Sequence, residues 1–244
     1  MARDDLTVGP RTRIRRLAER QRTDRAELYR ILDAALVAHV AVVRDGCPVV
    51  IPFLCARDDD ALLLHGSTGS GVLRAAEAGN PVSVGVTLLD GLVVARSVFD
   101  NSMNYRSVVA FGVPEVLAGE AKLEALRVLT DRILPGRWDE VRPSTRKELA
   151  ATLILRLNLD EVSVKVRAES VTAADDDGED RAAWTGVVPL TVRAGEPVTH
   201  GDVPADVAVP DSVRGLVERL RGDAQRIESA TRAAARLDPP GPSE

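Results

Sequence analysis

The 244-residue chain has few aromatic residues, few cysteines and few histidines. Phe, Trp and Tyr make up only 3% of it, so the core must be aliphatic and each aromatic residue is informative. Its two cysteines, Cys47 and Cys55, fit a reducing compartment. If both lie on one strand they are roughly 26 Å apart, too far for a disulfide. The two cysteines are also too few, and too far apart along the chain, to form a zinc site with the three histidines. No metal site is therefore predicted.

The chain also lacks a long apolar run, an apolar leader after its polar first residues, and an excess of positive charge. No membrane span or secretory signal is therefore predicted, and the expected location is the cytoplasm. The net charge of -5 does not indicate a nucleic-acid binder. The basic run at residues 11–22 leaves DNA contact as a minor alternative to a solvated lead-in. No nucleophile elbow, HExxH motif or paired-carboxylate arrangement is present, so a bound cofactor would have to supply any chemistry.

Apolar, β-branched runs joined by turns too short for crossovers predict an antiparallel sheet rather than a doubly wound parallel one. Asp24 and Glu27 form a capping-box pattern before an amphipathic helix at 25–36. Asp45-Gly46 and Asp90-Gly91 are typical of hairpin turns. The expected strands are 40–43, 48–56, 61–65, 81–89, 92–99, 105–117, 154–167 and 184–192, and the further expected helices are 72–78, 119–134, 144–152 and 211–236.

Two polar segments interrupt this pattern. The small-residue loop Gly66–Gly71 follows a strand and could hold an anion through its N–H groups and hydroxyls, although a plain flexible turn is equally compatible. It lacks the Gly-Lys-Ser/Thr ending of a phosphate-binding P-loop. His65, just before it, could donate to a cofactor or could simply be satisfied by the backbone.

The segment Ser102–Ser107 has two hydroxyls, an amide, a phenol and a guanidinium between apolar strands. Arg106 carries a planar fork that suits a phosphate or a carboxylate, and Arg96 on the preceding strand could add a second charge. A surface turn with an ordinary salt bridge is the alternative. The density of polar groups favours an anion-binding site.

These segments resemble the flavin-nucleotide-binding, nitroimidazole-resistance-like branch of the pyridoxamine 5′-phosphate oxidase-like superfamily. The resemblance covers roughly residues 11–215 and is most specific from Asp90 to Gly112. The matching stretches are Tyr29–Asp33, Val50–Pro52, Leu64–Ser67, Asp90–Ser97, Ser102–Val109, Pro135–Arg137, Lys165–Arg167, Trp184–Val187 and Pro189-Leu190.

The resemblance implies a mainly β, α+β fold: an antiparallel split β-barrel with flanking helices that forms a homodimer and binds FMN at the subunit interface. FAD or the deazaflavin F420 are the alternative cofactors. Arg106 would be the main charge partner of the phosphate, and Trp184 would approach the ring, from the same or the other subunit. The implied cofactor-binding residues are Ile51, Pro52, Phe53, His65, Gly66, Ser67, Thr68, Ser102, Met103, Asn104, Tyr105, Arg106, Ser107 and Trp184.

Two departures bear on affinity. The family often has Ser-Arg where this chain has Ser70-Gly71, which removes one cationic phosphate ligand. It often has histidines where this chain has Asp100-Asn101, which removes a histidine role there.

The leading hypothesis is an FMN-dependent oxidoreductase that acts on a small molecule, with NAD(P)H as a possible electron donor. The alternatives are a non-catalytic flavin carrier or sensor and a deazaflavin- or haem-binding relative on the same barrel. The expected organisation is a basic lead-in at 1–22, an FMN-binding split-barrel domain at 23–192, a C-terminal extension with a helix at 193–237 and a disordered tail at 238–244.

Overall fold

A computed structural model describes residues 5–171 and 182–237 of the chain. The chain folds into two compact units, each considered by itself below. The first unit contains the described residues up to 87, together with 107–165 and 210–212, and the second contains 88–106 and the described parts of 166–209 and 213–244. The predicted acidic loop at 175–180 and the predicted disordered tail lie outside the described residues. The predicted domain boundaries stay predictions.

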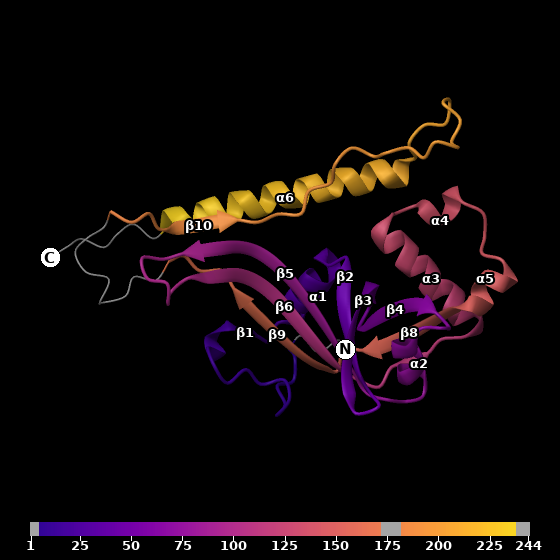
Figure 1. Cartoon of the computed structure of the whole chain (residues 1–244), viewed down its shortest axis with the longest axis horizontal. Coiled ribbons are helices and arrows are strands. Elements are labelled where there is room, and N and C mark those ends of the chain that lie inside the picture. The colour runs from indigo at the N-terminus through magenta and orange to yellow at the C-terminus, as the bar shows by residue number, and fades with distance from the viewer. Residues whose placement is uncertain (1–4, 172–181, 238–244) are drawn as a thin grey trace. The chain divides into compact units, whose positions relative to one another are not determined.

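The first unit is built on an antiparallel meander. Strands β2, β3 and β4 pair in sequence order, and β8 pairs antiparallel with β4 (Figure 1). The complete strand order is β1-β9-β6-β5-β2-β3-β4-β8-β7, with β10 paired to β5. The meander and the mainly antiparallel α+β class are confirmed. The strands are β1 Gln21–Arg22, β2 Val37–Arg44, β3 Cys47–Asp58, β4 Ala61–Ser67, β5 Val82–Val94, β6 Ser102–Gly112, β7 Glu115–Val116, β8 Thr152–Asn158, β9 Glu161–Arg167 and β10 Gly186–Pro189.

The helices largely follow the predicted periodicity. Asp24 caps the N-terminus of α1, because its carboxylate accepts the backbone N–H of Ala26 at 2.8 Å. Glu27 does not close the predicted capping box, since its carboxylate accepts hydrogen bonds from Arg30 at 2.6 and 2.9 Å. The α4 helix was not predicted. The helices are η1 Ala18–Arg20, α1 Arg25–Ala34, α2 Gly71–Glu77, α3 Gly119–Ile133, α4 Arg137–Glu140, α5 Arg146–Ala151 and α6 Asp211–Leu237.

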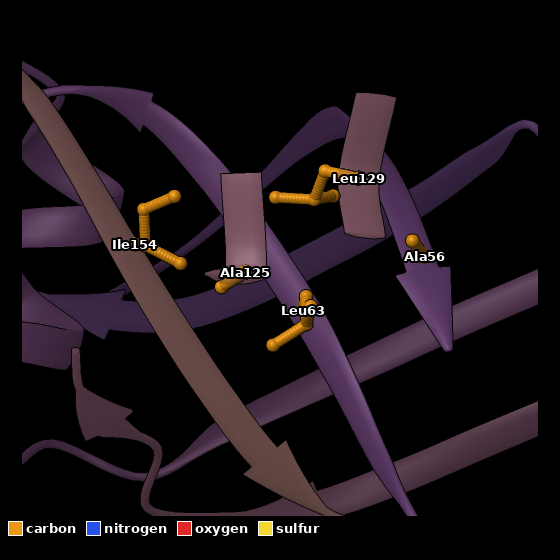
Figure 2. Packing of buried hydrophobic residues seen from close by; sticks show 5 residues of the cluster. All are labelled: Ala56, Leu63, Ala125, Leu129 and Ile154. Carbon is orange, nitrogen blue, oxygen red and sulfur yellow. The ribbon is translucent and has the colours of Figure 1, made fainter. Parts of the chain in front are cut away.

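An aliphatic cluster joins α3 to the sheet of the first unit. Figure 2 shows Ala125 and Leu129 of α3 packed with Leu63 of β4, Ile154 of β8 and Ala56 of β3. All five residues are at most 4% exposed. The scarcity of aromatic residues thus has the predicted result, a core of aliphatic side chains.

Both cysteines lie on β3, with Cys47 exposed and Cys55 buried, and neither is in a disulfide. Burial raises the pKa of the Cys55 thiol to about 11. Among residues 5–171 and 182–237, no helix has the length and apolarity needed to cross a membrane.

The predicted hairpin at Asp90-Gly91 is wrong, because β5 runs without a break through both residues to Val94. Gly91 serves instead as a point of close approach: a Cβ there would lie 3.0 Å from the Val188 carbonyl oxygen of β10. The chain turns later, at 97–101. Phe99, predicted to end a strand, lies in this turn and is 92% exposed.

The predicted single strand at 154–167 is also wrong, because the chain bends at Leu159-Asp160 and forms two separate strands. β8 pairs with β4 and β7, whereas β9 pairs with β1 and neighbours β6 in the strand order. Leu159 is buried and donates its N–H to the Asp60 carbonyl at 2.9 Å. The turn therefore contains an apolar residue and no glycine or proline, which is why the pattern looked continuous.

Two other segments differ from the sequence-based prediction, one near β10 and one before α1. Trp184, expected on a strand, precedes β10. The segment before α1, expected to be solvated, contains the buried residues Leu6 and Thr12, and its Gln21–Arg22 strand pairs with β9.

Candidate functional site

The middle of β3 and the end of β4 meet around Phe53 and Gly66 in the first unit. A Cβ on Gly66 would lie 2.8 Å from Leu73 Cδ1 and 3.3 Å from Phe53 Cε1, so only glycine lets β4 pass this closely. Phe53 is half-buried, whereas Ile51 and Pro52 are exposed. The structure thus brings the predicted site residues Phe53 and Gly66 together.

His65 stands beside Gly66 at the end of β4 and is half-buried. Its Nδ1 atom is buried and has no hydrogen-bond partner among the described residues. Burial lowers the pKa of the imidazole, which keeps the ring neutral near neutral pH. A neutral ring with an unused buried nitrogen is prepared to meet a ligand.

The loop after β4 uses part of its polar capacity internally. Ser67 Oγ accepts the N–H of Gly69 at 3.1 Å, and Ser70 Oγ accepts the N–H of Leu73 at 3.4 Å. Thr68 donates its backbone N–H to the Ala151 carbonyl at 3.0 Å. These bonds order the loop and leave the hydroxyl protons of Ser67 and Thr68 available as donors.

A guanidinium occupies the space at Gly71, where the sequence lacks the expected arginine. The nearest atom to a Cβ built on Gly71 is Nη1 of Arg44, from the end of β2. The side chain of Arg44 is half-exposed, and its carboxylate neighbour Asp45 lies at 3.9 Å. A positive charge therefore stands at this loop in spite of the sequence departure.

In the second unit, Arg106 forms an ion pair with Asp90. Its Nε and Nη2 donate to the two carboxylate oxygens of Asp90 at 2.9 and 2.7 Å, with the Arg106 side chain 25% and the Asp90 side chain 18% exposed. This bidentate pair joins β6 to β5. Two of the N–H groups that were expected to bind a phosphate are thus already used.

Asn104 is similarly occupied. Its Nδ2 donates to the Glu169 carbonyl at 2.9 Å, and its Oδ1 accepts the Glu169 N–H at 3.2 Å and a 2.5 Å hydrogen bond from Arg167. The segment after β9 is thereby fastened to β6. The side chain of Asn104 thus has a structural role, since it joins β6 to Arg167 and Glu169.

The remaining members of the predicted segment differ in exposure. Ser102 and Met103 are exposed, and Tyr105 is half-buried. Ser107, in the first unit, donates from Oγ to the Lys165 carbonyl at 3.3 Å. Trp184, in the second unit, is 65% exposed, and its indole lies 2.9 Å from where a Gly186 Cβ would stand.

Sequence reasoning gave too little weight to Arg96. This residue follows β5 in the second unit, and its Nε atom is buried without a hydrogen-bond partner among residues 5–171 and 182–237. The only signal in the sequence was a lone cation after an apolar strand. That signal does not distinguish a paired arginine from an unpaired one.

Within the described part of the chain, no group of three or more His, Cys, Asp or Glu side chains is arranged to hold a metal ion. The site residues fall into two sets. The first unit contains Ile51–Phe53, His65–Thr68 and Ser107, and the second contains Ser102–Arg106 and Trp184.

Comparisons with known proteins identify the family. The family model for pyridoxamine 5′-phosphate oxidase matches residues 24–166. The FAD and haem binding protein from Mycobacterium smegmatis is 50% identical, with a TM-score of 0.78 over 81% of this chain and 97% of that one. A flavocytochrome from Azotobacter vinelandii is 34% identical, with a TM-score of 0.80 over 85% of this chain and 96% of that one.

A candidate 5-nitroimidazole resistance protein from Bacteroides thetaiotaomicron shares the fold, at 20% identity and a TM-score of 0.50 over 60% of this chain and 86% of that one. A comparison with curated proteins found no match. The split β-barrel with flanking helices and the resemblance stated from the sequence are both confirmed. The chain belongs to the pyridoxamine 5′-phosphate oxidase family.

Proposed function

We propose that this protein is a flavin-binding redox protein that also binds haem. The observation that carries the proposal is the 50% identity to a protein named for binding FAD and haem, over 97% of that protein's length. The 34% identical flavocytochrome supports the same pair of cofactors. Haem, an alternative in the sequence reasoning, thus becomes part of the leading proposal, and FAD is the first flavin to test, ahead of FMN and F420.

The residues of the first unit fit a flavin. Gly66 brings β4 close to Phe53, and the neighbouring His65 has a buried ring nitrogen without a hydrogen-bond partner among the described residues. The hydroxyls of Ser67 and Thr68 and the guanidinium of Arg44 add donors for the polar part of the cofactor. Within the second unit, considered by itself, the exposed residues Ser102 and Met103 and the half-buried Tyr105 remain proposed cofactor-binding residues.

Two histidines suit the binding of haem iron, which takes neutral imidazole nitrogens. One is His65, described above. The other is His200 of the second unit, whose Nδ1 lies 2.5 Å from Asp202 Oδ1. A carboxylate at one ring nitrogen orients the other toward a metal, an arrangement common among metal-binding histidines. Each is a candidate iron ligand in its own right.

A bound flavin would supply hydride or electron transfer, and the chain's own residues would bind and orient the cofactors and exclude water. The substrate class proposed is a small molecule, with NAD(P)H as the electron donor. Neither nucleic acid nor membrane belongs to the proposal, and the proposed location is the cytoplasm. A non-catalytic flavin carrier is the second candidate function, distinguished by the absence of NAD(P)H oxidation when acceptor is supplied.

The cofactors themselves provide the first test. We expect the purified protein to release a flavin on denaturation, identified by its mass as FAD, FMN or F420, and to show the intense visible absorption band of a ligated haem. Replacing His65 by Ala should remove or shift the haem band because an iron ligand is lost. An unchanged far-ultraviolet circular dichroism spectrum of the same variant shows that it is folded. A colourless protein that takes up neither cofactor would refute the proposal, and unchanged haem spectra in both His65→Ala and His200→Ala would refute the assigned ligands.

We also propose that two copies associate through the β2–β3 ribbon. Val37 faces Leu54 across the ladder, so Val37, Val43, Val50 and Leu54 share one face of it. These side chains are 48%, 65%, 56% and 37% exposed in a single copy. Such a contiguous apolar face is typical of a protein interface, and a second copy would bring further residues to the exposed Pro52 beside Phe53.

The association is tested by the molar mass in solution. We expect the wild-type chain to run as a dimer and Val50→Glu to run as a monomer, because a carboxylate on this face would be desolvated on association. Val198→Glu, at a side chain that is 96% exposed in the second unit, is the matched control. A monomeric wild-type chain, or a Val50→Glu variant that remains dimeric, would contradict the proposed interface.

A further inference from the structure

We propose that Arg96 binds an oxyanion of the cofactor, the role that the sequence assigned to Arg106. The group it would meet is a flavin phosphate or a haem carboxylate, which present the same oxygen geometry to a guanidinium. The inference rests on the proposed function only in requiring that a cofactor binds. It concerns the second unit alone.

Arg106 is already committed. Both oxygens of Asp90 accept from it, at 2.9 and 2.7 Å, and this carboxylate is only 18% exposed. A phosphate that took these two N–H groups would leave the Asp90 carboxylate without its partner, close to a second anion. The pair therefore favours a structural role for Arg106.

Arg96 presents the opposite situation. The residue is half-buried, its Nε is buried, and the described residues offer that N–H no hydrogen-bond acceptor. Arginine side chains keep their positive charge in proteins, so this cost is not relieved by loss of a proton. A buried N–H group without an acceptor reduces stability, so the unsatisfied Nε–H of Arg96 indicates a ligand that completes the arrangement.

The loop around Arg96 satisfies its other polar groups internally. Ser97 Oγ donates to Asp100 Oδ2 at 2.5 Å and accepts the Asp100 N–H at 3.0 Å. Asn101 Oδ1 accepts the Ala95 N–H at 2.9 Å. The carboxylate of Asp100, the acidic residue nearest to Arg96 in the sequence, is thus hydrogen-bonded to Ser97. Arg96 lies between Ala95 and Ser97, which both take part in hydrogen bonds within the loop.

An aromatic side chain lies at the same end of the β5–β10 ribbon. Gly186, the first residue of β10, pairs with Val94, the last residue of β5, and Trp184 and Arg96 each lie two residues beyond this pair. The indole is 65% exposed and lies over Gly186, which leaves apolar surface at this end of the ribbon. A planar ring carrying an acidic group matches this combination of an aromatic surface and a guanidinium.

The test compares ligands that differ only in the anion. The full-length chain is stripped of cofactor and titrated with FMN against riboflavin, and with haem against haem dimethyl ester. We expect Arg96→Gln to weaken binding of one anionic ligand by about tenfold while its uncharged analogue binds unchanged. The ligand pair that responds identifies the source of the oxyanion. Arg96→Lys should recover part of the loss, since it restores the charge without the planar fork.

The unfolding temperature of the cofactor-free protein is a second measurement. Arg96→Gln is expected to weaken ligand binding but not to lower this temperature. Without cofactor, Arg96→Gln should unfold at the same temperature as the wild-type chain or higher, because it removes an unpaired charge. Arg193→Gln, at an exposed arginine of the same unit, is the matched control and should change neither property.

Three results would overturn the assignment. They are equal affinities of wild type and Arg96→Gln for all four ligands, equal losses for charged and uncharged analogues, and a lower unfolding temperature for the cofactor-free variant. A wild-type chain that binds none of these four ligands, and neither FAD nor F420, would instead refute the proposed function. The two failures are therefore distinguishable.

Discussion

Replacing Leu63 by Ala should lower the free energy of unfolding by about 3 kcal/mol, the usual cost of truncating a fully buried leucine. Leu63 is 0% exposed and lies in the cluster that joins α3 to β4 and β8 (Figure 2). The neighbours Ala56 and Ala125 are already small, so they cannot fill the space that Leu63 leaves. The cost therefore includes both the lost burial and a residual cavity.

The measurement is a urea titration of cofactor-free protein, because a ligand that binds only the folded state would add its own stabilisation. Leu123→Ala is the matched control. Leu123 lies on the same helix but is 40% exposed, so its truncation should cost less than about 1 kcal/mol. Equal losses for the two variants would show that the cluster is not the stabilising contact of α3.

The meander could be predicted because its turns are encoded locally. Asp45 and Gly46 both have positive φ, 52° and 76°, as a tight hairpin turn requires. Asp59, in the next predicted turn, also has a positive φ of 46°. The tight turn at Asp45-Gly46 joins β2 directly to β3, which fixes the register of β3 against β2.

The errors arose where a local signal was overruled by a distant partner. Asp90-Gly91 has the composition of a turn, but β10 pairs with this stretch from almost one hundred positions along the chain and keeps it extended. Leu159 is apolar, so the turn at β8–β9 had no local signal at all. Both features depend on tertiary packing, which a single sequence does not display.

The candidate site shows the same limit at the level of side chains. The sequence showed correctly that polar residues gather at 102–107, and the structure places all of them on β6. It could not show which arginine is neutralised, because the Asp90–Arg106 pair forms between β5 and β6, and Asp90 was expected in a turn after a strand that ended at residue 89. Opposite charges on neighbouring strands were the available signal, and the false turn at Asp90 concealed it.

Replacing Arg106 by Ala should lower the free energy of unfolding by about 2 kcal/mol, a charge-assisted bidentate pair discounted for its partial exposure. The variant leaves the Asp90 carboxylate, 18% exposed, without the two N–H donors it now has. Asp90→Ala should have a similar cost for the reciprocal reason. The double variant should cost less than the sum of the two, by about 1 kcal/mol or more, because neither charge is then left alone.

The Arg106→Ala and Asp90→Ala variants also show whether Arg106 has a structural role or binds a phosphate. If Arg106 acts by holding β6 against β5, then Arg106→Ala and Asp90→Ala weaken FMN and riboflavin binding to the same extent, because the lost contact is not with the phosphate. A loss confined to FMN in Arg106→Ala, with Asp90→Ala unaffected, would return the phosphate to Arg106. The control pair is Arg127 and Glu124 on α3, joined at 2.6 Å but with side chains 51% and 58% exposed. Removing either of these should change neither stability nor binding measurably, because solvent already screens the charges, and it is burial that gives the Asp90–Arg106 pair its larger effect.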